Sequence, residues 1–598
     1  MEPSAAAPSA RSTGSTTIAD MIGLAAERFA DQVAGSRKLD GSWLGITYAE
    51  TGTVVSEIAG GLIGMGLEVG DRVAILCTTR PEWAHASFAI SSAGGVVVPI
   101  YPTNSAEECG YVAGDSEARF IVCEDAEQVA KITAVRDDLP ALAGVVVIDP
   151  SGDLGDAVSL ADLRERGRSR DAGEVSARAQ AVRPEDPYTF IYTSGTTGPP
   201  KGCVLSHGNY RSVLDMCSEL NTLEPGDDVY LYLPLAHSYA LLIQLLAVDV
   251  GASVAYFGGD TKQIVPELME VKPHYMPSVP RIFEKIYTLV TSSGDPEKIR
   301  GATALGLQVR ALREARRPVP GELQAAFDQA DAELFANVRN VFGGRLKQAN
   351  TGAAPIAQEI LEFFYACGVP VLEGYGLTET STVSTTQTIE HHRFGTVGRA
   401  LPGSAVRIAD DGEVLLKGPH IFGGYHNLSD ESFGAIEDGW LHTGDLGSLD
   451  DDGYLTITGR KKDIIITAGG KNLTPANLEN DLKQSRWISQ AVMYGDRRPY
   501  PVALITLDPE EIVHFASEHG LPDDIAALCT EPKVHELVRG VLDAANARYA
   551  RVEQIKRFVI LDHDLSLETG ELTPTLKVKR NVVHERYARR FEELYARS

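Results

Sequence analysis

Apolar and polar positions alternate along most of the 598-residue chain in a way that predicts strands separated by helices. Stretches of helical periodicity, such as 18–31 and 47–65, are followed by short apolar runs. The runs that we interpret as strands are 72–76, 96–99, 120–122, 144–148, 188–193, 229–234 and 253–257. Strands that alternate with helices are typical of parallel sheets covered by helices on both faces. The pattern therefore predicts an α/β fold.

Two later segments depart from this alternation. Residues 292–340 are rich in Ala, Glu, Arg and Leu, and they predict amphipathic helices inserted between α/β units. Residues 395–458 hold short strands between turn signals such as Asp411-Gly412, and they predict a small β-rich subdomain. The pattern of apolar and polar positions changes again after Gly459, where expected strands and helices no longer alternate regularly.

These changes predict the domain organisation. Residues 1–17 are rich in Ala, Ser and Pro, and we expect them to form a disordered tail. Residues 18–458 form a large N-terminal domain of two α/β subdomains with parallel-rich sheets plus the β-rich subdomain. Residues 459–463 form a hinge, and residues 464–598 form a small mobile α+β C-terminal domain.

Composition limits the functions that this fold could perform. The chain has 55 Lys and Arg against 82 Asp and Glu, which gives a net charge of −27. Such a surface repels phosphate backbones, so we expect no nucleic-acid partner, although small anions can still be held by local amides. Seven cysteines without a CxxC pair indicate reduced thiols in the cytoplasm. No stretch approaches about 18 uninterrupted apolar residues, so we expect no membrane span.

The segment 192–202, YTSGTTGPPKG, carries the clearest chemical signal. Glycines let backbone N–H groups converge on an anion, hydroxyls add donors, and Lys201 adds a point charge. No GxxxxGK[ST] pattern is present, so the segment is not a Walker A loop. We predict a polyphosphate-binding loop rather than an unstructured surface loop. Its expected nucleotide-binding residues are Thr193, Ser194, Gly195, Thr196, Thr197, Gly198 and Lys201.

This loop resembles the signature loop of the adenylate-forming superfamily, which includes acyl-CoA synthetases, firefly-type luciferases and the adenylation domains of peptide synthetases. Each of the further matching motifs is weak alone, and their common order along the chain gives them value. They are 234–239 (PLAHSY), 351–355 (TGAAP), 373–380 (EGYGLTET), 443–445 (TGD), 459–463 (GRKKD) and 572–580 (LTPTLKVKR). The chain is most similar to the bacterial long-chain fatty-acid–CoA ligases.

The resemblance implies a role for each motif residue that faces the nucleotide. Tyr375 offers a flat ring on which adenine can stack. Glu379 is a hard oxygen ligand suited to Mg²⁺, with Thr193 as a second ligand. Asp445 corresponds to the carboxylate that accepts hydrogen bonds from both ribose hydroxyls, and Arg460 to a ribose contact. The further nucleotide contacts that the resemblance implies are Gly352, Ala353, Gly374, Gly376 and Thr378.

The C-terminal motifs imply catalysis that moves between two arrangements. Lys577 matches the catalytic lysine, although Leu576 stands where many members have Gly. Lys462 matches the residue about which the C-terminal domain turns. The catalytic set that the resemblance implies is Lys577, Glu379, Thr193 and Lys201.

The remaining motifs concern the acid and the thiol. His237 matches a residue that gates the carboxylate pocket, and Ser238 is neutral where amino-acid-activating members carry Asp. A plain carboxylic acid is therefore favoured over an amino acid. The resemblance implies an acyl and coenzyme A pocket formed by His237, Ser238, Gly352, Ala468, Gly469 and Gly470.

The expected function follows from the resemblance. With ATP, Mg²⁺ and coenzyme A, a long-chain fatty acid becomes acyl-AMP with release of pyrophosphate, and then acyl-CoA with release of AMP. The alternatives are an acyl-AMP ligase that delivers the acyl group to a carrier protein, a medium-chain or aryl-acid CoA ligase, a peptide-synthetase adenylation domain, and an inactive lipid-binding relative. A homodimer and peripheral contact with the inner face of the membrane stay open.

Overall fold

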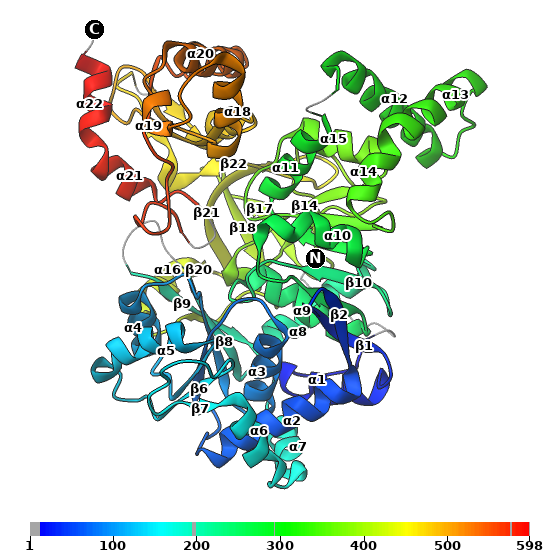
Figure 1. Ribbon diagram of the computed structural model, residues 1–598, viewed down its shortest axis with the longest axis vertical. Helices are drawn as coiled ribbons and strands as arrows, with labels where there is room; N and C mark the ends of the chain where they lie inside the picture. Colours follow the sequence, from blue (N-terminus) through cyan, green and yellow to red (C-terminus); the bar gives the residue numbers. More distant parts are fainter. Residues whose placement is uncertain (1–11, 194–198, 292–293, 470, 574–576, 597–598) are drawn as a thin grey trace.

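The computed structural model describes residues 12–193, 199–291, 294–469, 471–573 and 577–596. Two large, mainly parallel sheets with their helices form most of the N-terminal part, and an antiparallel sheet connects them to a smaller C-terminal unit (Figure 1). The predicted fold class is therefore confirmed.

The first large sheet has eight strands in the order β19-β9-β8-β4-β3-β5-β6-β7. They are β3 (Arg72–Leu76), β4 (Val96–Ile100), β5 (Phe120–Cys123), β6 (Gly144–Val147), β7 (Val158–Ser159), β8 (Pro187–Thr193), β9 (Lys201–Ser206) and β19 (Gly424–Tyr425). Pairing is parallel from β8 to β7 and antiparallel at β8–β9 and β9–β19. The strand before the predicted phosphate loop is therefore β8, and the strand after it is β9.

The second large sheet has nine strands in the order β16-β15-β14-β13-β12-β10-β11-β1-β2. They are β1 (Val33–Leu39), β2 (Ser42–Thr47), β10 (Asp228–Leu231), β11 (Ser253–Tyr256), β12 (Tyr275–Ser278), β13 (Gln348–Thr351), β14 (Val371–Tyr375), β15 (Thr385–Thr386) and β16 (Arg399–Ala400). Pairing is parallel from β1 to β14. The TGAAP and EGYGLTET motifs therefore begin at the carboxyl ends of neighbouring parallel strands, β13 and β14.

Helix α9 (Ser238–Val250) joins the two sheets. Every residue of α9 except Tyr239 is buried, and a helix that is apolar on all sides lies inside a core. One hydrophobic cluster contains α9 together with Val73 and Val97 of the first sheet and Val229 and Val254 of the second. The two sheets therefore share one core.

The other helices of the N-terminal part pack around these sheets or extend from them. They are α1 (Ile18–Arg28), α2 (Tyr48–Gly64), α3 (Pro81–Ser92), α4 (Ala106–Asp115), α5 (Ala126–Ala134), α6 (Leu160–Arg168), α7 (Ala172–Ala181), α8 (His207–Glu219), α10 (Ile264–Val271), α11 (Pro280–Thr291), α12 (Pro296–Glu314), α13 (Gly321–Ala330), α14 (Ala336–Val341) and α15 (Gln358–Cys367). Helices α12 and α13 lie in the segment expected to be a helical insertion, and Figure 1 shows them extending from the body at the upper right.

An antiparallel sheet leads into the C-terminal unit. It contains β17 (Ala405–Ile408), β18 (Glu413–Lys417), β20 (Ile436–Glu437), β21 (Trp440–Leu449) and β22 (Leu455–Arg460), with α16 (Ser429–Ala435) beside it. Strand β22 thus continues two residues past the expected end of the β-rich segment at 458. A single 3₁₀ turn, Lys461–Asp463, follows β22.

The C-terminal unit is an α+β structure built on a three-stranded sheet. Its strands are β23 (Ile465–Ile466), β24 (Asn472–Leu473), β25 (Ile488–Tyr494), β26 (Val502–Leu507) and β27 (Arg557–Ile560), of which the last three form that sheet. Its helices are α17 (Pro475–Lys483), α18 (Pro509–His519), α19 (Ile525–Leu528), α20 (Pro532–Asn546), α21 (Arg580–Arg586) and α22 (Ala588–Ala596).

The prediction of a disordered tail is wrong for residues 12–17. The hydroxyls of Ser12 and Thr13 donate to Oδ1 of Asp249 at 2.9 and 2.6 Å, and the same carboxylate pairs with Arg211 at 2.6 Å. The Asp249 side chain has no exposed surface. A buried ion pair needs further hydrogen bonds, and the polar N-terminal segment supplies them.

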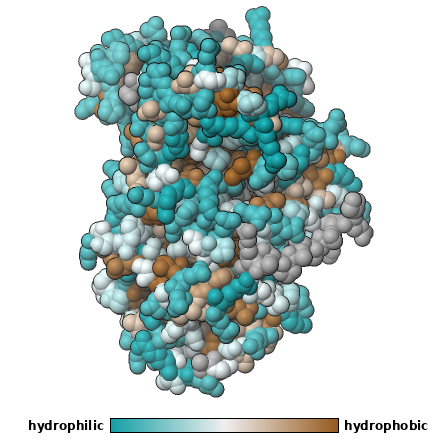
Figure 2. Space-filling model, turned by 90° about the vertical axis from the view of Figure 1, so that its right-hand side faces the viewer, coloured by the Kyte–Doolittle hydropathy of each residue, from teal (hydrophilic) through white to brown (hydrophobic). Residues whose placement is uncertain are grey.

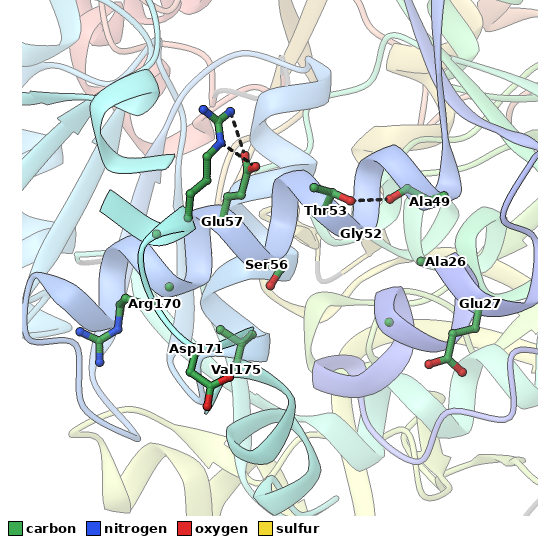
Figure 3. Close-up of a pocket in the computed structure, with 14 residues that line it drawn as sticks. Ala26, Glu27, Ala49, Gly52, Thr53, Ser56, Glu57, Arg170, Asp171 and Val175 are labelled. Carbon is green, nitrogen blue, oxygen red and sulfur yellow. Dashed lines mark hydrogen bonds and ion pairs between the residues drawn. The ribbon is translucent and has the colours of Figure 1, made fainter. Parts of the chain in front are cut away.

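A groove of about 610 Å³ lies between α1, α2 and the segment that joins α6 to α7 (Figure 3). Small residues such as Gly52 and Gly60 line it, and the carboxylate of Glu57 beside them pairs with Arg168 at 2.8 Å. Glycine is required where the helices meet, because a Cβ on Gly167 would lie 1.8 Å from the carbonyl oxygen of Glu57. None of the residues that line this groove is a predicted site residue.

The surface agrees with the acidic composition. On the face shown in Figure 2, hydrophilic residues cover most of the area and apolar residues occur in small separate groups. Within the described ranges, no helix combines the length and the apolar character needed to cross a membrane. All seven cysteines are buried free thiols.

Candidate active site

Strands β8 and β9 place both ends of the predicted phosphate loop together. Thr193 is the register partner of Lys201, and its hydroxyl lies 3.5 Å from the Lys201 carbonyl oxygen and 4.0 Å from Sγ of Cys203. The predicted loop residues Ser194, Gly195, Thr196, Thr197 and Gly198 lie outside the described residues. Lys201 and Thr193 therefore stand at the base of the loop, on adjacent strands.

Tyr425 of strand β19 links Glu379 to this base. Strand β19 pairs with β9, and the Tyr425 hydroxyl donates to Oε1 of Glu379 at 2.8 Å. The ammonium of Lys201 lies 5.4 Å from the centre of the Tyr425 ring, a cation–π distance. The backbone N–H of Phe422 donates to the Glu379 carbonyl at 2.8 Å and holds the 3₁₀ turn (Thr378–Thr380) that carries Thr378 and Glu379.

The oxygen atoms beside this turn fit a Mg²⁺ ion that is shared with substrate phosphates. The thiol of Cys203 interacts with both Thr193 and Glu379, so a hydroxyl and a carboxylate lie on the same side of β9. Among the described residues no cluster of three His, Cys, Asp or Glu forms a complete metal site. Mg²⁺ commonly binds through one or two carboxylates plus phosphates and water, and this site supplies one carboxylate and one hydroxyl of such a set.

A second group of residues surrounds Asp445. The Tyr375 hydroxyl donates to Oδ2 of Asp445 at 2.7 Å, and Nε of Arg460 donates to Oδ1 at 2.9 Å. Asp445 and Arg460 are register partners on β21 and β22, and the Asp445 side chain is 5% exposed. Burial and the neighbouring carboxylate raise the pKa of Tyr375, so this hydroxyl remains a donor. The structure thus brings three of the predicted nucleotide-binding side chains into direct contact.

The glycines of the two motifs form the backbone between these groups. A Cβ on Gly376 would lie 2.2 Å from the Thr382 carbonyl oxygen, and one on Gly352 would lie 3.4 Å from that of Gly374. Ala353 has φ of 68°, a left-handed conformation that is uncommon for residues other than glycine. Ligands of α/β sheets bind at the carboxyl ends of the strands, where these residues lie.

Glu373 is a residue at this edge that sequence reasoning did not assign. It is the register partner of Thr351, and Oε2 of Glu373 and Oγ1 of Thr351 are buried without a hydrogen-bond partner among the described residues. Burial raises the pKa of Glu373 to about 8. A carboxyl whose pKa favours the protonated form at neutral pH and a hydroxyl therefore lie unpaired at this edge among the described residues.

Lys577 reaches these groups from the C-terminal unit. The residue is exposed as a whole, yet its ammonium lies within electrostatic reach of Arg460, Asp445 and Glu379. Burial of the ammonium, together with Arg460, lowers the pKa of Lys577 to about 8. The lysine from one end of the chain and the carboxylates of the N-terminal part therefore form one charged site.

His237 lies at the start of α9, where it is the residue that precedes the first turn of the helix. Its Nδ1 accepts a hydrogen bond from the Tyr239 backbone N–H at 3.1 Å, so the proton of the neutral ring is on Nε2. Burial, together with Lys577, lowers the pKa of His237 to about 4, and Ser238 beside it is 2% exposed. His237 and Ser238 therefore carry no charge at neutral pH.

The expected hinge and thiol-channel residues lie in the segment that follows β22. Lys462 is exposed in the 3₁₀ turn after β22, while its neighbour Lys461 pairs with Asp411 at 2.6 Å. Ala468 and Gly469 follow β23 and are exposed, and neither hydrogen-bonds to the site residues above in the part of the chain that the structure describes. The predicted Gly470 lies outside the described residues.

Ion pairs between helices hold the C-terminal unit in this orientation. Arg281 of α11 pairs with Asp508, which also accepts from the backbone at the start of α18. Lys285 of α11 lies 3.7 Å from Glu510 of α18. Figure 1 shows the C-terminal unit above the sheets, adjacent to α11.

Known proteins match the chain along nearly its full length. The AMP-binding enzyme model matches residues 24–426, and the AMP-binding enzyme C-terminal domain model matches residues 462–598. The long-chain-fatty-acid–CoA ligase FadD15 of Mycobacterium bovis is 40% identical over 94% of both chains. The long-chain-fatty-acid–CoA ligase ACSBG1 of Rattus norvegicus is 32% identical over 97% of this chain and 85% of its own.

Solved structures show the same fold. The adenylation domain of a carboxylate reductase from Mycobacterium chelonae superposes with a TM-score of 0.76 at 20% identity, covering 98% of this chain and 93% of that one. The anthranilate CoA ligase AuaEII with anthranoyl-AMP has a TM-score of 0.71 at 20% identity and coverage of 97% and 98%. Together with the site geometry, these matches show that the chain belongs to the AMP-binding, adenylate-forming enzyme family.

Proposed function

We propose that the protein is an AMP-forming long-chain-fatty-acid–CoA ligase. The observation that carries this proposal is the position of Lys577, which the C-terminal unit places within electrostatic reach of Glu379 and Asp445. This arrangement is suited to the first half-reaction, in which a carboxylate approaches ATP. Relatives that are named for this activity are 32–40% identical over most of the chain.

In the first half-reaction a carboxylate oxygen of the fatty acid attacks the α-phosphorus of ATP. The bond from this phosphorus to the bridging oxygen breaks, and pyrophosphate leaves with that electron pair. Both reactants are anions, so catalysis consists mainly of cancelling charge and positioning the reactants. Lys577 neutralises the acyl carboxylate and α-phosphate oxygens, and Lys201 with the loop amides neutralises the β- and γ-phosphates.

The remaining site residues orient the two substrates. Tyr375 lies against adenine, and Asp445, held by Tyr375 and Arg460, accepts from the ribose hydroxyls. Glu379 and Thr193 would hold Mg²⁺, which would supply positive charge to the phosphate oxygens. His237 presents its Nε2–H on the acyl side. Because His237 and Ser238 are neutral, this side suits an acid without an α-amine.

In the second half-reaction the thiolate of coenzyme A attacks the acyl carbonyl, and AMP leaves. This step needs different groups at the same carbonyl, so the C-terminal unit turns about Lys462, withdraws Lys577 and presents Ala468, Gly469 and Gly470. The position of Lys462 in one exposed turn between β22 and β23 supports this pivot.

The long-chain acid places the enzyme near lipid. We propose a cytoplasmic enzyme, in agreement with its buried free thiols, that makes at most peripheral contact with the inner face of the membrane. The resemblance leaves a homodimer open.

Pyrophosphate release tests the proposed function against its alternatives. With oleate and ATP we expect release that becomes catalytic only when coenzyme A is added. Catalytic turnover that requires a carrier protein would indicate an acyl-AMP ligase, and turnover with benzoate but not oleate would indicate an aryl-acid ligase. Absence of release with every acid would indicate an inactive relative.

The pH dependence of acyl-AMP formation should follow the loss of the proton from the Lys577 ammonium. The ammonium is the active form, so kcat/KM for ATP should fall as pH rises through about 8, the pKa to which Lys577 is lowered. In Lys577→Arg the guanidinium keeps its proton, so the alkaline limb should disappear. The measurement is the rate of pyrophosphate release between about pH 6 and pH 10. An unchanged limb in the arginine variant would assign the ionisation to another group.

Substitution Lys462→Pro should impair the second half-reaction more than the first. Proline fixes φ and restricts the preceding residue, which opposes rotation at this turn. A penalty of only about 1.4 kcal/mol on the rotated arrangement would slow thioester formation about tenfold. Thioester formation from supplied acyl-AMP is compared with acyl-AMP formation. Lys462→Ala, which leaves φ free, is the control, and normal rates of both steps in the proline variant would place the pivot elsewhere.

A further inference from the structure

The segment that carries Lys577 is closed at its base by hydrogen bonds. The backbone N–H of Lys579 donates to the Glu571 carbonyl at 2.7 Å, and that of Thr573 donates to the Lys577 carbonyl at 2.8 Å. The backbone N–H of Lys577 donates to Oγ1 of Thr573 at 3.1 Å. Residues 571–573 and 577–579 therefore form two short antiparallel segments, here called the hairpin, with Glu571 and Lys579 at the base and Lys577 beside Thr573.

The side chain of Glu571 anchors this base. Its carboxylate has no exposed surface. Oε1 accepts from the Tyr587 hydroxyl at 2.5 Å and from Nη1 of Arg586 at 2.9 Å, and Oε2 accepts from the Thr569 hydroxyl at 2.5 Å. Burial alone would raise the pKa of Glu571, but the hydrogen bonds from Thr569, Tyr587 and Arg586 outweigh it, so the pKa is lowered. The group is an ionised carboxylate with strong, charge-assisted bonds.

These partners connect the hairpin to the helices that follow it. Arg586 ends α21, and Tyr587 lies between α21 and α22. Helix α21 is itself fixed at its start, because Arg580 forms two hydrogen bonds, at 2.7 and 2.8 Å, with the buried carboxylate of Glu479 on α17. Two buried carboxylates, Glu571 and Glu479, thus hold the base of the hairpin and the start of α21 within the C-terminal unit.

We propose that Glu571 is a positioning residue for Lys577. Its carboxylate fixes the base of the hairpin against Tyr587 and Arg586, and this keeps the lysine ammonium extended toward Asp445 and Glu379. The inference rests on the proposed function, in which Lys577 acts in acyl-AMP formation and is withdrawn afterwards. Loss of the anchor should therefore affect one half-reaction, whereas general destabilisation would affect both.

The test measures both half-reactions in Glu571→Gln, in Lys577→Ala and in the double variant. We expect Glu571→Gln to slow acyl-AMP formation about 10-fold to 100-fold, which corresponds to the loss of a hydrogen-bonded buried charge, and to leave thioester formation from supplied acyl-AMP unchanged. In the Lys577→Ala background, Glu571→Gln should cause no further loss, because both substitutions remove the same contribution.

Two further variants keep the result interpretable. Tyr587→Phe removes one hydroxyl from the Glu571 carboxylate and should cause a smaller loss in the same half-reaction, so it replaces Glu571→Gln if that variant does not fold. Tyr549→Phe is the matched control, because its hydroxyl bonds to Asp481 at 2.8 Å, a tyrosine–carboxylate pair outside the hairpin. Both half-reactions should be normal in this control.

The possible outcomes distinguish the positioning role of Glu571 from the proposed catalytic role of Lys577. Equal loss in both half-reactions, or losses that add in the double variant, would overturn the positioning role. Normal acyl-AMP formation in Glu571→Gln and Tyr587→Phe, with Lys577→Ala impaired, would overturn the inference alone. Normal acyl-AMP formation in Lys577→Ala would overturn the proposed function of Lys577 itself.

Discussion

Replacing Lys577 with alanine is expected to slow acyl-AMP formation by about 100-fold or more. The ammonium lies within electrostatic reach of Asp445 and Glu379, and in the proposed mechanism the acyl carboxylate meets the α-phosphate beside it. Nothing else on the C-terminal hairpin supplies charge at that point in the described structure. Thioester formation from supplied acyl-AMP should be unaffected, because the proposed mechanism withdraws the lysine for that step. Pyrophosphate release and acyl-CoA formation measure the two steps separately.

Lys579→Ala is the matched control for this prediction. It removes a lysine from the same segment but keeps the backbone N–H that bonds to the Glu571 carbonyl. We expect both half-reactions to remain near normal. Equal loss of both half-reactions in Lys577→Ala would mean that the lysine supports the fold of the unit and does not act in one step.

Substitution Glu379→Gln is expected to lower kcat/KM for acyl-AMP formation about 100-fold or more at limiting Mg²⁺. The amide keeps the shape of the side chain but loses the negative charge that a hard cation requires. The concentration of Mg²⁺ needed for half-maximal rate should therefore rise, and a Mg²⁺ titration of pyrophosphate release measures it. Binding of supplied acyl-AMP, which lacks the β- and γ-phosphates, should change little.

Tyr425→Phe separates the charge of Glu379 from its orientation. The variant removes the hydroxyl that donates to Oε1 of Glu379 at 2.8 Å and keeps the carboxylate. We expect a loss of about tenfold, the usual worth of one hydrogen bond to a charged group, with a smaller change in Mg²⁺ requirement than in Glu379→Gln. An unaltered Mg²⁺ requirement in Glu379→Gln would exclude this carboxylate as the metal ligand.

The site residues that could be predicted from the sequence are those that lie in short motifs resembling motifs of the family. Tyr375, Glu379, Asp445, Arg460 and Lys577 each lie in a stretch that resembles a family motif, and the structure brings them together. The fold class could also be predicted, because helices and strands each have a characteristic spacing of apolar residues in the sequence. The resemblance of the motifs predicted the site residues, and the periodicity of apolar positions predicted the sheets.

The parts that the sequence did not predict depend on distant pairing. Tyr425 reaches Glu379 only because β19 adds to β9, and Glu571 acts through side chains on later helices. Ser12 and Thr13 are ordered by Asp249, a residue more than two hundred positions away. In each case a polar residue bonds to a side chain from a distant part of the chain. The sequence around that residue contains no pattern from which this partner could be predicted.

The pairing of β19 with β9 also has a consequence for how the protein is made. Roughly 220 residues separate the two strands along the chain, and at about 5–20 residues per second their translation takes on the order of 10–45 s. Throughout that interval the nascent first sheet ends at β9, an open edge with unpaired backbone groups of the kind that recruits other chains. The strand that bears Lys201 is therefore an open edge of ribosome-bound intermediates, at which chaperones can prevent association with other chains during synthesis.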